Sequence, residues 1–206
     1  MIKVYLSRIN ETGRDAQKKA GRDLLIRALA AEYPQIREHP VIVENEYGKP
    51  YLKDFPDIFF NISHSADAVA CAVADCDVGV DVQAHRKLSK HIERKFHSEE
   101  RRFLERLPYE CREKAFFDIW TRKESFMKAD GRGLRIPLDG FCSVSGEERD
   151  AGRLFGGIPV RVGREVCGRD FFVMQCDAAG EGLSLAVCAS ENEFDTFDLD
   201  FYSAVW

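Results

Sequence analysis

Three short apolar segments follow one another at residues 58–62, 68–74 and 79–83, and a helical pattern then runs through residues 98–129. Segments of this length and composition are typical of strands with at least one buried face. The long pattern is apolar on several sides, which is typical of a helix packed inside a fold. This order of strands followed by helices predicts helices packed against mainly antiparallel sheets, an α+β fold.

The remaining elements complete this order. A first strand is expected at residues 1–6, and a helix at residues 15–33 carries an apolar stripe that Pro34 ends. Pro108 interrupts the long helical pattern, and Gly131 ends it. Further predictions are a strand at 41–43, strands at 171–176 and 183–189 in a strand region that begins at residue 141, and a peripheral surface segment at 191–206.

Residues 68–74 and 183–189 have similar sequences, Ala-Val-Ala-Cys-Ala-Val-Ala and Leu-Ser-Leu-Ala-Val-Cys-Ala. They could be equivalent strands of two similar halves. No Gly/Ser-rich linker separates the halves, so we expect them to pack closely.

Composition excludes several classes of protein. A chain of 206 residues can bury a full core, and its net charge of −5 argues against a nucleic-acid-binding surface. The longest apolar run, residues 68–74, is far short of the ~20 residues that cross a membrane. The seven cysteines are odd in number and form no Cys-x-x-Cys pair, which favours reduced thiols in a cytoplasmic protein.

The strand at residues 79–83 carries the first candidate site. Its valines alternate with Asp81 and Gln83, so one carboxylate and one amide project from the face opposite the valines. Oxygen ligands of this kind suit Mg²⁺, which takes one or two carboxylates and completes its shell with water and substrate phosphate. The alternative is an amphipathic edge strand whose polar face is solvated.

The long helix carries the second candidate site. Glu124 and Lys128 are four residues apart, share one helix face and can bring their charged groups together. Such pairs are usually weak surface salt bridges. Here aromatic residues surround them, and a buried Glu and Lys are costly unless they are paired or used.

A third candidate is the end of the strand at residues 58–62, where Ser63, His64 and Ser65 follow. Hydroxyl and imidazole donors suit a phosphate group. A Ser-His hydrolase is a poor interpretation, because neighbouring strand residues face opposite ways and no Gly-x-Ser-x-Gly motif is present.

Taken together, these segments resemble the 4′-phosphopantetheinyl transferase superfamily, in particular its larger, two-lobed, Sfp-like members. The resemblance covers residues 47–141. It rests on the segments Gly48-Lys49-Pro50, Phe60-Asn61-Ile62-Ser63-His64-Ser65, Gly79-Val80-Asp81-Val82-Gln83, Lys95-Phe96-His97-Ser98-Glu99-Glu100, Trp120-Thr121-Arg122-Lys123-Glu124-Ser125, Lys128 and Gly131-x-Gly133-Leu134.

The resemblance implies transfer of the phosphopantetheine arm of coenzyme A to a serine of an apo acyl or peptidyl carrier protein, with release of 3′,5′-ADP. It also implies a monomer of two similar subdomains, which we place at residues 1–95 and 96–206, with the active site between them. The N-terminal subdomain would supply nucleotide contacts and Asp81, and the C-terminal one the catalytic helix.

The resemblance also implies roles for individual residues. Asp81 and Glu124, with Gln83 nearby, would hold Mg²⁺; Glu124 would act as the base, and Lys128 would stabilise the departing nucleotide. The implied phosphate contacts are Lys49, Ser63, His64 and Arg22, with Lys18 and Lys19 as looser candidates. Gln83 stands where many members carry a second acidic ligand, which weakens its assignment.

Two alternatives stay open from the sequence. One is a non-catalytic coenzyme A or nucleotide-binding protein that keeps the phosphate site, and the other is a metal-dependent phosphohydrolase. Carrier proteins of this kind are acidic, so a basic patch is expected near the cleft. The segment 91–106, which holds Arg94, Lys95, Arg101, Arg102 and Arg106, could be that patch or a solvated helix face.

Overall fold

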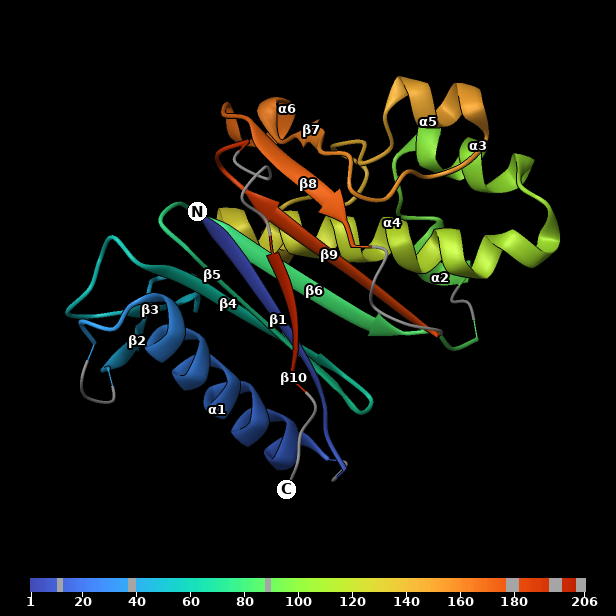
Figure 1. Ribbon diagram of the computed structural model, residues 1–206. Coiled ribbons are helices and arrows are strands. Elements are labelled where there is room, and N and C mark those ends of the chain that lie inside the picture. Colours follow the sequence, from blue (N-terminus) through green and yellow to red (C-terminus); the bar gives the residue numbers. More distant parts are fainter. Residues whose placement is uncertain (11–12, 37–39, 88–89, 177–181, 193–197, 203–206) are drawn as a thin grey trace.

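The computed structural model of the chain describes residues 1–10, 13–36, 40–87, 90–176, 182–192 and 198–202. Its strands and helices form two four-stranded sheets, a two-stranded ribbon and two long helices, shown in Figure 1. The elements are β1 (Ile2–Arg8), α1 (Arg14–Glu32), β2 (Ile42–Glu44), β3 (Pro50–Leu52), β4 (Phe59–Ser65), β5 (Ala68–Ala74), β6 (Val78–Ala84), α2 (Lys90–Glu93), α3 (Ser98–Arg106), α4 (Tyr109–Asp130), η1 (Gly133–Arg135), α5 (Gly146–Ala151), β7 (Val160–Val162), α6 (Arg164–Cys167), β8 (Phe171–Gln175), β9 (Leu183–Ala189) and β10 (Asp198–Tyr202).

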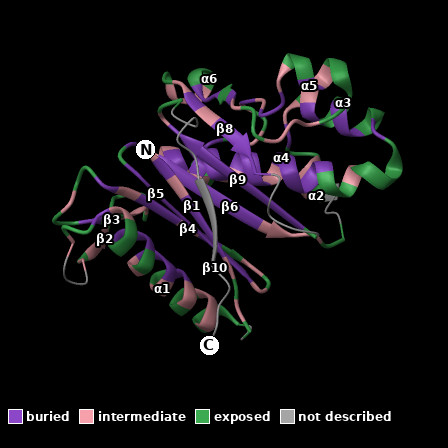
Figure 2. Cartoon of the chain, in the orientation of Figure 1, coloured by how far each residue is buried: buried purple, intermediate pink, exposed green. Residues whose placement is uncertain are grey.

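The first sheet has the strand order β10-β1-β5-β4. β5 lies antiparallel between β1 and β4, and its seven residues are all buried. One face of this sheet is covered by α1, whose Leu24, Leu25 and Leu29 pack on Val69 and Val73 of β5. The outer face of α1 is green in Figure 2, because its other residues are largely exposed.

β10 corrects one prediction. Residues 191–206 were expected to lie on the surface as a peripheral segment, but Asp198–Tyr202 pairs in parallel with β1 and becomes an edge strand. β1 is paired with β5 on its other side, so its outer backbone groups would otherwise be open to water. Residues 193–197 and 203–206 of the predicted segment lie outside the described residues.

The second sheet has the strand order β6-β9-β8-β7 and is antiparallel throughout. α4 covers one of its faces, with Phe126 packed against Phe171 of β8 and near Ala186 and Cys188 of β9. The other face packs against the first sheet. Figure 1 shows the result: α1 at lower left and α4 at upper right, with the strands of both sheets between them.

The contact between the two sheets is the largest apolar cluster of the described residues. Valines of β6 and alanines of β5 meet there, together with apolar residues of β1 and β9. The two sheet-based halves are thus held by burial of apolar surface, which is the dominant favourable term in folding. This arrangement confirms the expected α+β fold of helices packed on antiparallel sheets.

The two sheet-based halves do not coincide with residues 1–95 and 96–206. β6 precedes residue 95, but it is hydrogen-bonded to β9 in the second sheet. The division into subdomains at residues 1–95 and 96–206 stays a prediction. The two similar segments, β5 and β9, both lie inside their sheets and are buried over their whole length.

The predicted helices are confirmed as α1 and as α3 and α4, with the break at Pro108, which stands at the start of α4. Gly131 ends α4 in a left-handed conformation, as expected. The short helices α5 and α6 were not predicted in the region that begins at residue 141. Each is only a turn or so long and carries too few residues for a helical period to be recognised. No helix of the described residues is long and apolar enough to cross a membrane.

Candidate active site

Gly79 brings the central strand and helix of the site into direct contact. A Cβ at this position would lie 2.1 Å from the carbonyl oxygen of Ser125 and 2.4 Å from the backbone nitrogen of Ala129. Only glycine permits β6 to approach the backbone of α4 this closely. As a result, side chains that project from β6 toward α4 meet those of the helix at short range.

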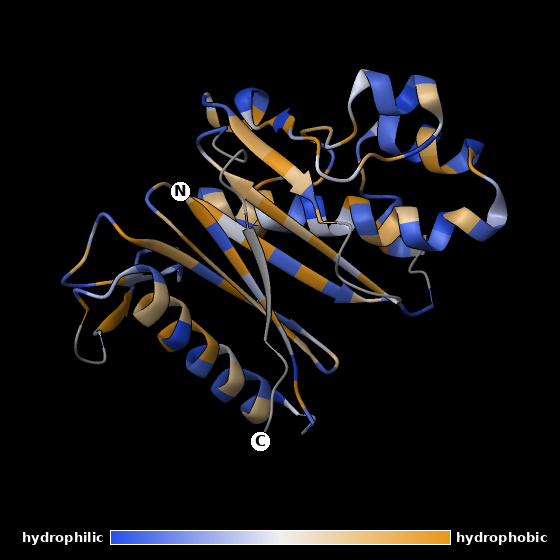
Figure 3. Ribbon diagram, viewed as in Figure 1, coloured by the Kyte–Doolittle hydropathy of each residue, from blue (hydrophilic) through white to orange (hydrophobic). Residues whose placement is uncertain are grey.

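Asp81 projects from β6 into this junction. Figure 3 shows hydrophilic and hydrophobic residues alternating along the strand. The valines belong to the apolar cluster between the two sheets, and the carboxylate meets Lys128 of α4. Asp81 is 2% exposed, so the interpretation of a solvated polar face is wrong at this position. Its Oδ1 accepts hydrogen bonds from Ser63 Oγ at 2.8 Å and Lys128 Nζ at 2.6 Å, and its Oδ2 accepts one from Gln83 Nε2 at 3.1 Å.

Lys128 comes from the last turn of α4 and reaches β6. Its Nζ donates to Ser63 Oγ at 2.9 Å, to the carbonyl oxygen of Val80 at 3.1 Å and to Asp81. The sequence suggested that Glu124 and Lys128 bring their charges together. Among the described residues, the ion pair of Lys128 is instead with Asp81, because Gly79 places the strand within its reach.

Glu124 lies one turn before Lys128 on the same face of α4. Burial, and after it the nearby charge of Asp81, raise the pKa of its carboxyl to about 7, while the charge of Lys128 acts in the opposite direction. A carboxyl with a pKa near 7 can take up and release a proton at neutral pH. The charge of Asp81 therefore acts on the Glu124 carboxyl.

The donor set fits a hard divalent cation. Asp81 and Glu124 supply two carboxylates, and Gln83 adds an amide whose nitrogen contacts Asp81. Such a set suits Mg²⁺ bound to substrate phosphates, for which one or two protein carboxylates suffice. In the described part of the chain no group of three or more His, Cys, Asp or Glu residues is placed to hold a metal on its own.

Ser63 and His64, predicted together as phosphate contacts, lie on opposite faces of β4. Ser63 is 4% exposed and belongs to the cluster with Asp81 and Lys128. His64 is exposed. Partial burial, then the charge of Lys128 and that of Arg14, lower the pKa of His64 below its ordinary value.

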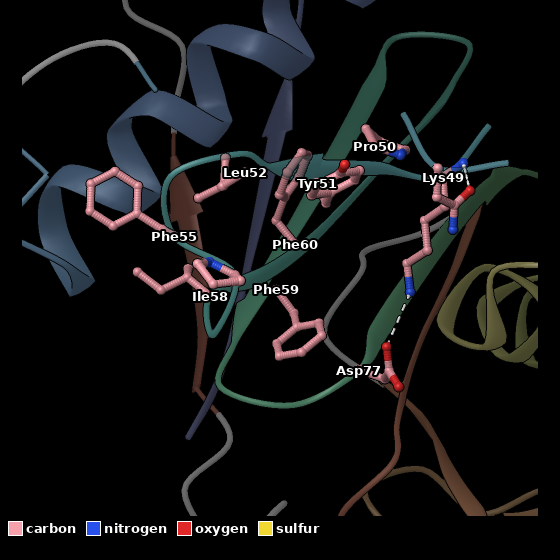
Figure 4. A pocket seen from close by; sticks show the side chains of 11 residues that line it. Lys49, Pro50, Tyr51, Leu52, Phe55, Ile58, Phe59, Phe60 and Asp77 are labelled. Carbon is pink, nitrogen blue, oxygen red and sulfur yellow. Dashed lines mark hydrogen bonds and ion pairs between the residues drawn. The ribbon is translucent and has the colours of Figure 1, made fainter. Parts of the chain in front are cut away.

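Lys49 lies away from this cluster, at the C-terminal end of α4. Its Nζ donates to the carbonyl oxygen of Ala129 at 2.6 Å and lies 3.8 Å from Asp77 Oδ1. Burial lowers its pKa, an effect that Asp77 opposes. Figure 4 shows Lys49 and Asp77 beside an otherwise mainly apolar cavity of about 270 Å³, lined also by Tyr51, Phe59 and Phe60.

Arg22 and Lys18 are exposed on α1, and Lys19 forms an exposed ion pair with Asp23. The helix is fixed against the first sheet at Gly21, where a Cβ would lie 2.8 Å from Ile62 Cγ2. Arg22 therefore sits beside β4 on the other side of the first sheet from β6, and the structure does not bring it into contact with Asp81.

Sequence reasoning did not assign Asn61, and it named Ser65 only as one of the donors suited to a phosphate. Both share the face of β4 that carries Ser63, and each accepts a hydrogen bond from a backbone N–H of β6. The signal was present as the alternation Asn61-x-Ser63-x-Ser65 in an otherwise apolar strand. A polar face of period two beside a buried sheet indicates that another element must satisfy it.

The geometry combines a base, a cation and a pair of carboxylates within one short stretch of β6 and α4. Glu124 can accept a proton, Lys128 can stabilise negative charge, and the carboxylates can hold a divalent cation. These are the components that phosphoryl transfer needs, since catalysis there is mostly positioning and charge stabilisation.

Comparison with known proteins agrees with this chemistry. The family model of the 4′-phosphopantetheinyl transferase superfamily matches residues 77–172. A 4′-phosphopantetheinyl transferase of Bacillus subtilis is 35% identical over 182 residues, which are 87% of this chain and 77% of the relative.

Two further relatives match shorter stretches. The 4′-phosphopantetheinyl transferase gsp of Aneurinibacillus migulanus is 38% identical over 130 residues, 62% of this chain and 54% of the relative. The 4′-phosphopantetheinyl transferase Sfp of Bacillus subtilis strain 168 is 35% identical over 130 residues, 62% of this chain and 58% of the relative. The matched part thus spans between about half and three quarters of the length of these relatives.

Proposed function

This chain belongs to the 4′-phosphopantetheinyl transferase superfamily, and we propose that it transfers the phosphopantetheine arm of coenzyme A to a serine of an apo acyl or peptidyl carrier protein. The observation that carries the proposal is the cluster of Asp81, Glu124 and Lys128. The relatives carry the transferase name, and the cluster supplies the groups that such a reaction requires.

The reaction breaks a phosphoanhydride bond of coenzyme A and forms a phosphoester bond to the acceptor serine. The hydroxyl oxygen of the acceptor serine attacks the phosphorus that bears the pantetheine arm, and the bond from that phosphorus to the bridging oxygen of the pyrophosphate breaks. The products are the phosphopantetheinyl serine and 3′,5′-ADP. A serine hydroxyl is a weak nucleophile at neutral pH, so a base must remove its proton.

Glu124 is the proposed base. Its pKa of about 7 places it where a general base works best near neutral pH. Burial is the main cause of the raised pKa, and a desolvated carboxylate is also a stronger proton acceptor than one in water.

Lys128 is proposed to stabilise the departing nucleotide. Its side chain is 26% exposed while its partner Asp81 is 2% exposed, so the ammonium group is the more accessible member of the pair. A cation at this place can neutralise charge on the leaving phosphate oxygen and donate a proton to it.

Asp81 and Glu124 would hold Mg²⁺, with Gln83 as a weaker or indirect contact. When bound, the ion would offset the negative charge of the pyrophosphate of coenzyme A. In the structure Asp81 forms an ion pair with Lys128.

Coenzyme A is proposed to contact Lys49, His64 and Arg22. His64 is supported by its exposure and by the positive charge of Lys128 and Arg14 around it. Lys49 is supported by its place beside the cavity of Figure 4, and Arg22 by its exposure on α1.

The carrier protein is proposed to dock near the segment 91–106. Arg94 and Arg101 line a cavity of about 790 Å³ between α3 and the start of α4, which also contains acidic residues such as Glu105 and an apolar floor of Leu104 and Phe116. A monomer would suffice for catalysis, since β6 and α4 of one chain supply Asp81, Glu124 and Lys128.

Incubation with coenzyme A, Mg²⁺ and a panel of apo carrier proteins tests the function. Mass spectrometry should detect the mass of one phosphopantetheine arm on the carrier serine, together with released 3′,5′-ADP. A carrier whose serine is replaced by alanine is the control. Failure to modify any carrier of the panel would refute the proposal, and binding of coenzyme A without transfer would point to the non-catalytic alternative.

A further inference from the structure

The polar face of β4 takes the place of a neighbouring strand along the outer edge of β6. Asn61 Oδ1 accepts from the N–H of Val80 at 3.0 Å, Ser63 Oγ from Val82 at 3.2 Å and Ser65 Oγ from Ala84 at 3.0 Å. β6 pairs with β9 on its other side, so these side chains satisfy backbone groups that no strand of the described residues reaches. This row of side chains joins the two sheets by hydrogen bonds.

Ser63 differs from the other two members of the row. Besides accepting from Val82, its hydroxyl donates to Asp81 Oδ1 and accepts from Lys128 Nζ. A serine hydroxyl has one proton to donate and two lone pairs to accept with. All three are used by protein groups, so no hydrogen-bonding capacity of Ser63 is left for a substrate phosphate in this arrangement.

We propose that Ser63 is a positioning residue for the reaction, acting through Asp81 and Lys128 and not by touching coenzyme A. This inference rests on the proposed function and revises the role that the family resemblance implied for Ser63. The hydroxyl ties β4 of one sheet to a carboxylate on β6 of the other and to a lysine on α4. It thereby fixes the position of both charged groups relative to each other.

The flexibility of a lysine side chain explains why a hydrogen bond from Lys128 to Ser63 matters. A lysine ammonium ends a flexible four-carbon stem and loses rotamer freedom when it is held in one place. The three N–H groups of Lys128 are used by Ser63, Val80 and Asp81. Removal of the Ser63 hydroxyl frees one of them and leaves the ammonium less confined, and a misplacement of about 1 Å can cost about a hundredfold in rate.

Ser65 provides a matched control on the same face of the same strand. Ser63→Ala and Ser65→Ala each delete one hydroxyl that accepts from a backbone N–H of β6. Of these two serines, Ser63 also hydrogen-bonds to Asp81 and Lys128. We expect Ser63→Ala to lower kcat about ten- to a hundredfold with the KM for coenzyme A within twofold, and Ser65→Ala to keep both within twofold.

The split between kcat and KM separates the possible roles. A rise in the KM for coenzyme A with unchanged kcat in Ser63→Ala would show direct contact with the substrate and overturn the inference. Equal losses of kcat in Ser63→Ala and Ser65→Ala would show that Ser63 only joins the two sheets. That result would also overturn the inference.

A double-mutant cycle with Lys128→Ala completes the test. If Ser63 acts through Lys128, Ser63→Ala should lower kcat less than twofold further in the Lys128→Ala background. An undiminished effect in that background would contradict the proposal.

The same cycle measured as urea unfolding does not depend on activity. The two substitutions should be non-additive in their effects on the unfolding free energy, because the groups are in contact; additivity would refute the contact itself. An inactive wild type would therefore refute the proposed function while leaving the contact between Ser63 and Lys128 open to measurement.

Discussion

The ammonium of Lys128 lies 2.6 Å from Oδ1 of Asp81, so a helix and a strand of the second half meet through one charged hydrogen bond. The carboxylate end of this bond is buried, and the lysine end is partly open to water. An incoming anion can therefore approach the lysine from its open side. Asp81 thus keeps the ammonium group of Lys128 at the place where the leaving group is expected.

Lys128→Ala should lower kcat by about a hundredfold or more, the range found when one stabilising group is removed from a charged transition state. Steady-state release of 3′,5′-ADP measures the effect. Lys114→Ala is the matched control, since Lys114 is a mainly exposed lysine of the same helix and pairs with Asp118, which Gln175 and Ser184 also satisfy. Activity of Lys128→Ala within fivefold of the wild type would rule out the proposed role.

Glu124→Gln should abolish transfer and at the same time stabilise the metal-free protein above neutral pH. Burial raises the pKa of Glu124 from its ordinary value of 4.5 to about 7 in the folded state. Protonated Glu124 therefore contributes to the free energy of unfolding. This contribution is fully present below about pH 4.5 and is lost as the pH rises through about 7. At pH 8 the ionised side chain should cost on the order of 2–3 kcal/mol, a cost that glutamine avoids.

Thermal unfolding in EDTA checks this prediction. The Tm of Glu124→Gln should exceed that of the wild type at pH 8, and the difference should shrink toward pH 4.5. A difference that is independent of pH would mean that Glu124 does not carry the raised pKa.

Gly79→Ala should destabilise the protein by about 3 kcal/mol or more and lower activity with it. The new Cβ would meet backbone atoms of Ser125 and Ala129 on α4, which cannot yield as a flexible side chain can. Gly146→Ala serves as the control, because its Cβ would meet nothing closer than 3.9 Å. Urea unfolding followed by circular dichroism measures both, and equal midpoints for the two variants would contradict the close approach of β6 to α4.

Glu148→Gln should destabilise the protein by about 3–5 kcal/mol, because it leaves the guanidinium of Arg122 charged and buried without its counter-ion. The matched control is Asp170→Asn in the exposed pair with Arg164, which should move the unfolding midpoint little. If both variants changed the unfolding midpoint only slightly, the buried ion pair would contribute no more to the stability of the folded protein than the exposed pair does.

Acid should weaken the same buried pair. Burial acts to raise the pKa of Glu148, but the hydrogen bonds and charge of Arg122 outweigh it and hold the pKa below its ordinary value. The stability that Glu148 contributes is therefore present above about pH 4.5 and is lost as the pH falls through the lower folded-state pKa. The stability of Glu148→Gln should fall less steeply than that of the wild type between pH 5 and pH 3, as followed by thermal unfolding.

Arg101→Glu should raise the KM for an acidic carrier protein about tenfold while leaving the KM for coenzyme A within twofold. Arg101 is exposed and lines the cavity between α3 and α4, where a positive charge would attract the carrier. Lys53→Glu, an equal charge reversal on an exposed residue after β3, is the control. No difference between the two variants would favour a solvated helix face over a docking patch.

Much of the site could be predicted because its signals are local. Asp81 is recognised from the period of two along β6, and Glu124 and Lys128 from a helical spacing inside an aromatic segment. The burial of α4 was predicted correctly for the same reason, since its apolar residues lie on several sides of the helix.

Other features depend on contacts between distant segments. The pairing of Lys128 with Asp81 requires the close approach at Gly79, and the placement of Lys49 against Ala129 joins residues 80 positions apart. The hydrogen bonds that Asn61 and Ser65 accept from backbone N–H groups of β6 depend on how the two sheets cross. No local spacing encodes these relationships, so they become visible only in the folded chain.

The parallel pairing of β1 with β10 has a consequence for synthesis on the ribosome. β1 is made well before β10, and β5 can pair with one of its edges early, but the partner of its other edge is Asp198–Tyr202. At about 5–20 residues per second, that edge stays open for roughly ten seconds or more while the rest of the chain is made. During this interval the nascent chain exposes an unpaired strand, which is where a chaperone would be expected to bind and where premature association between neighbouring polysome chains would begin.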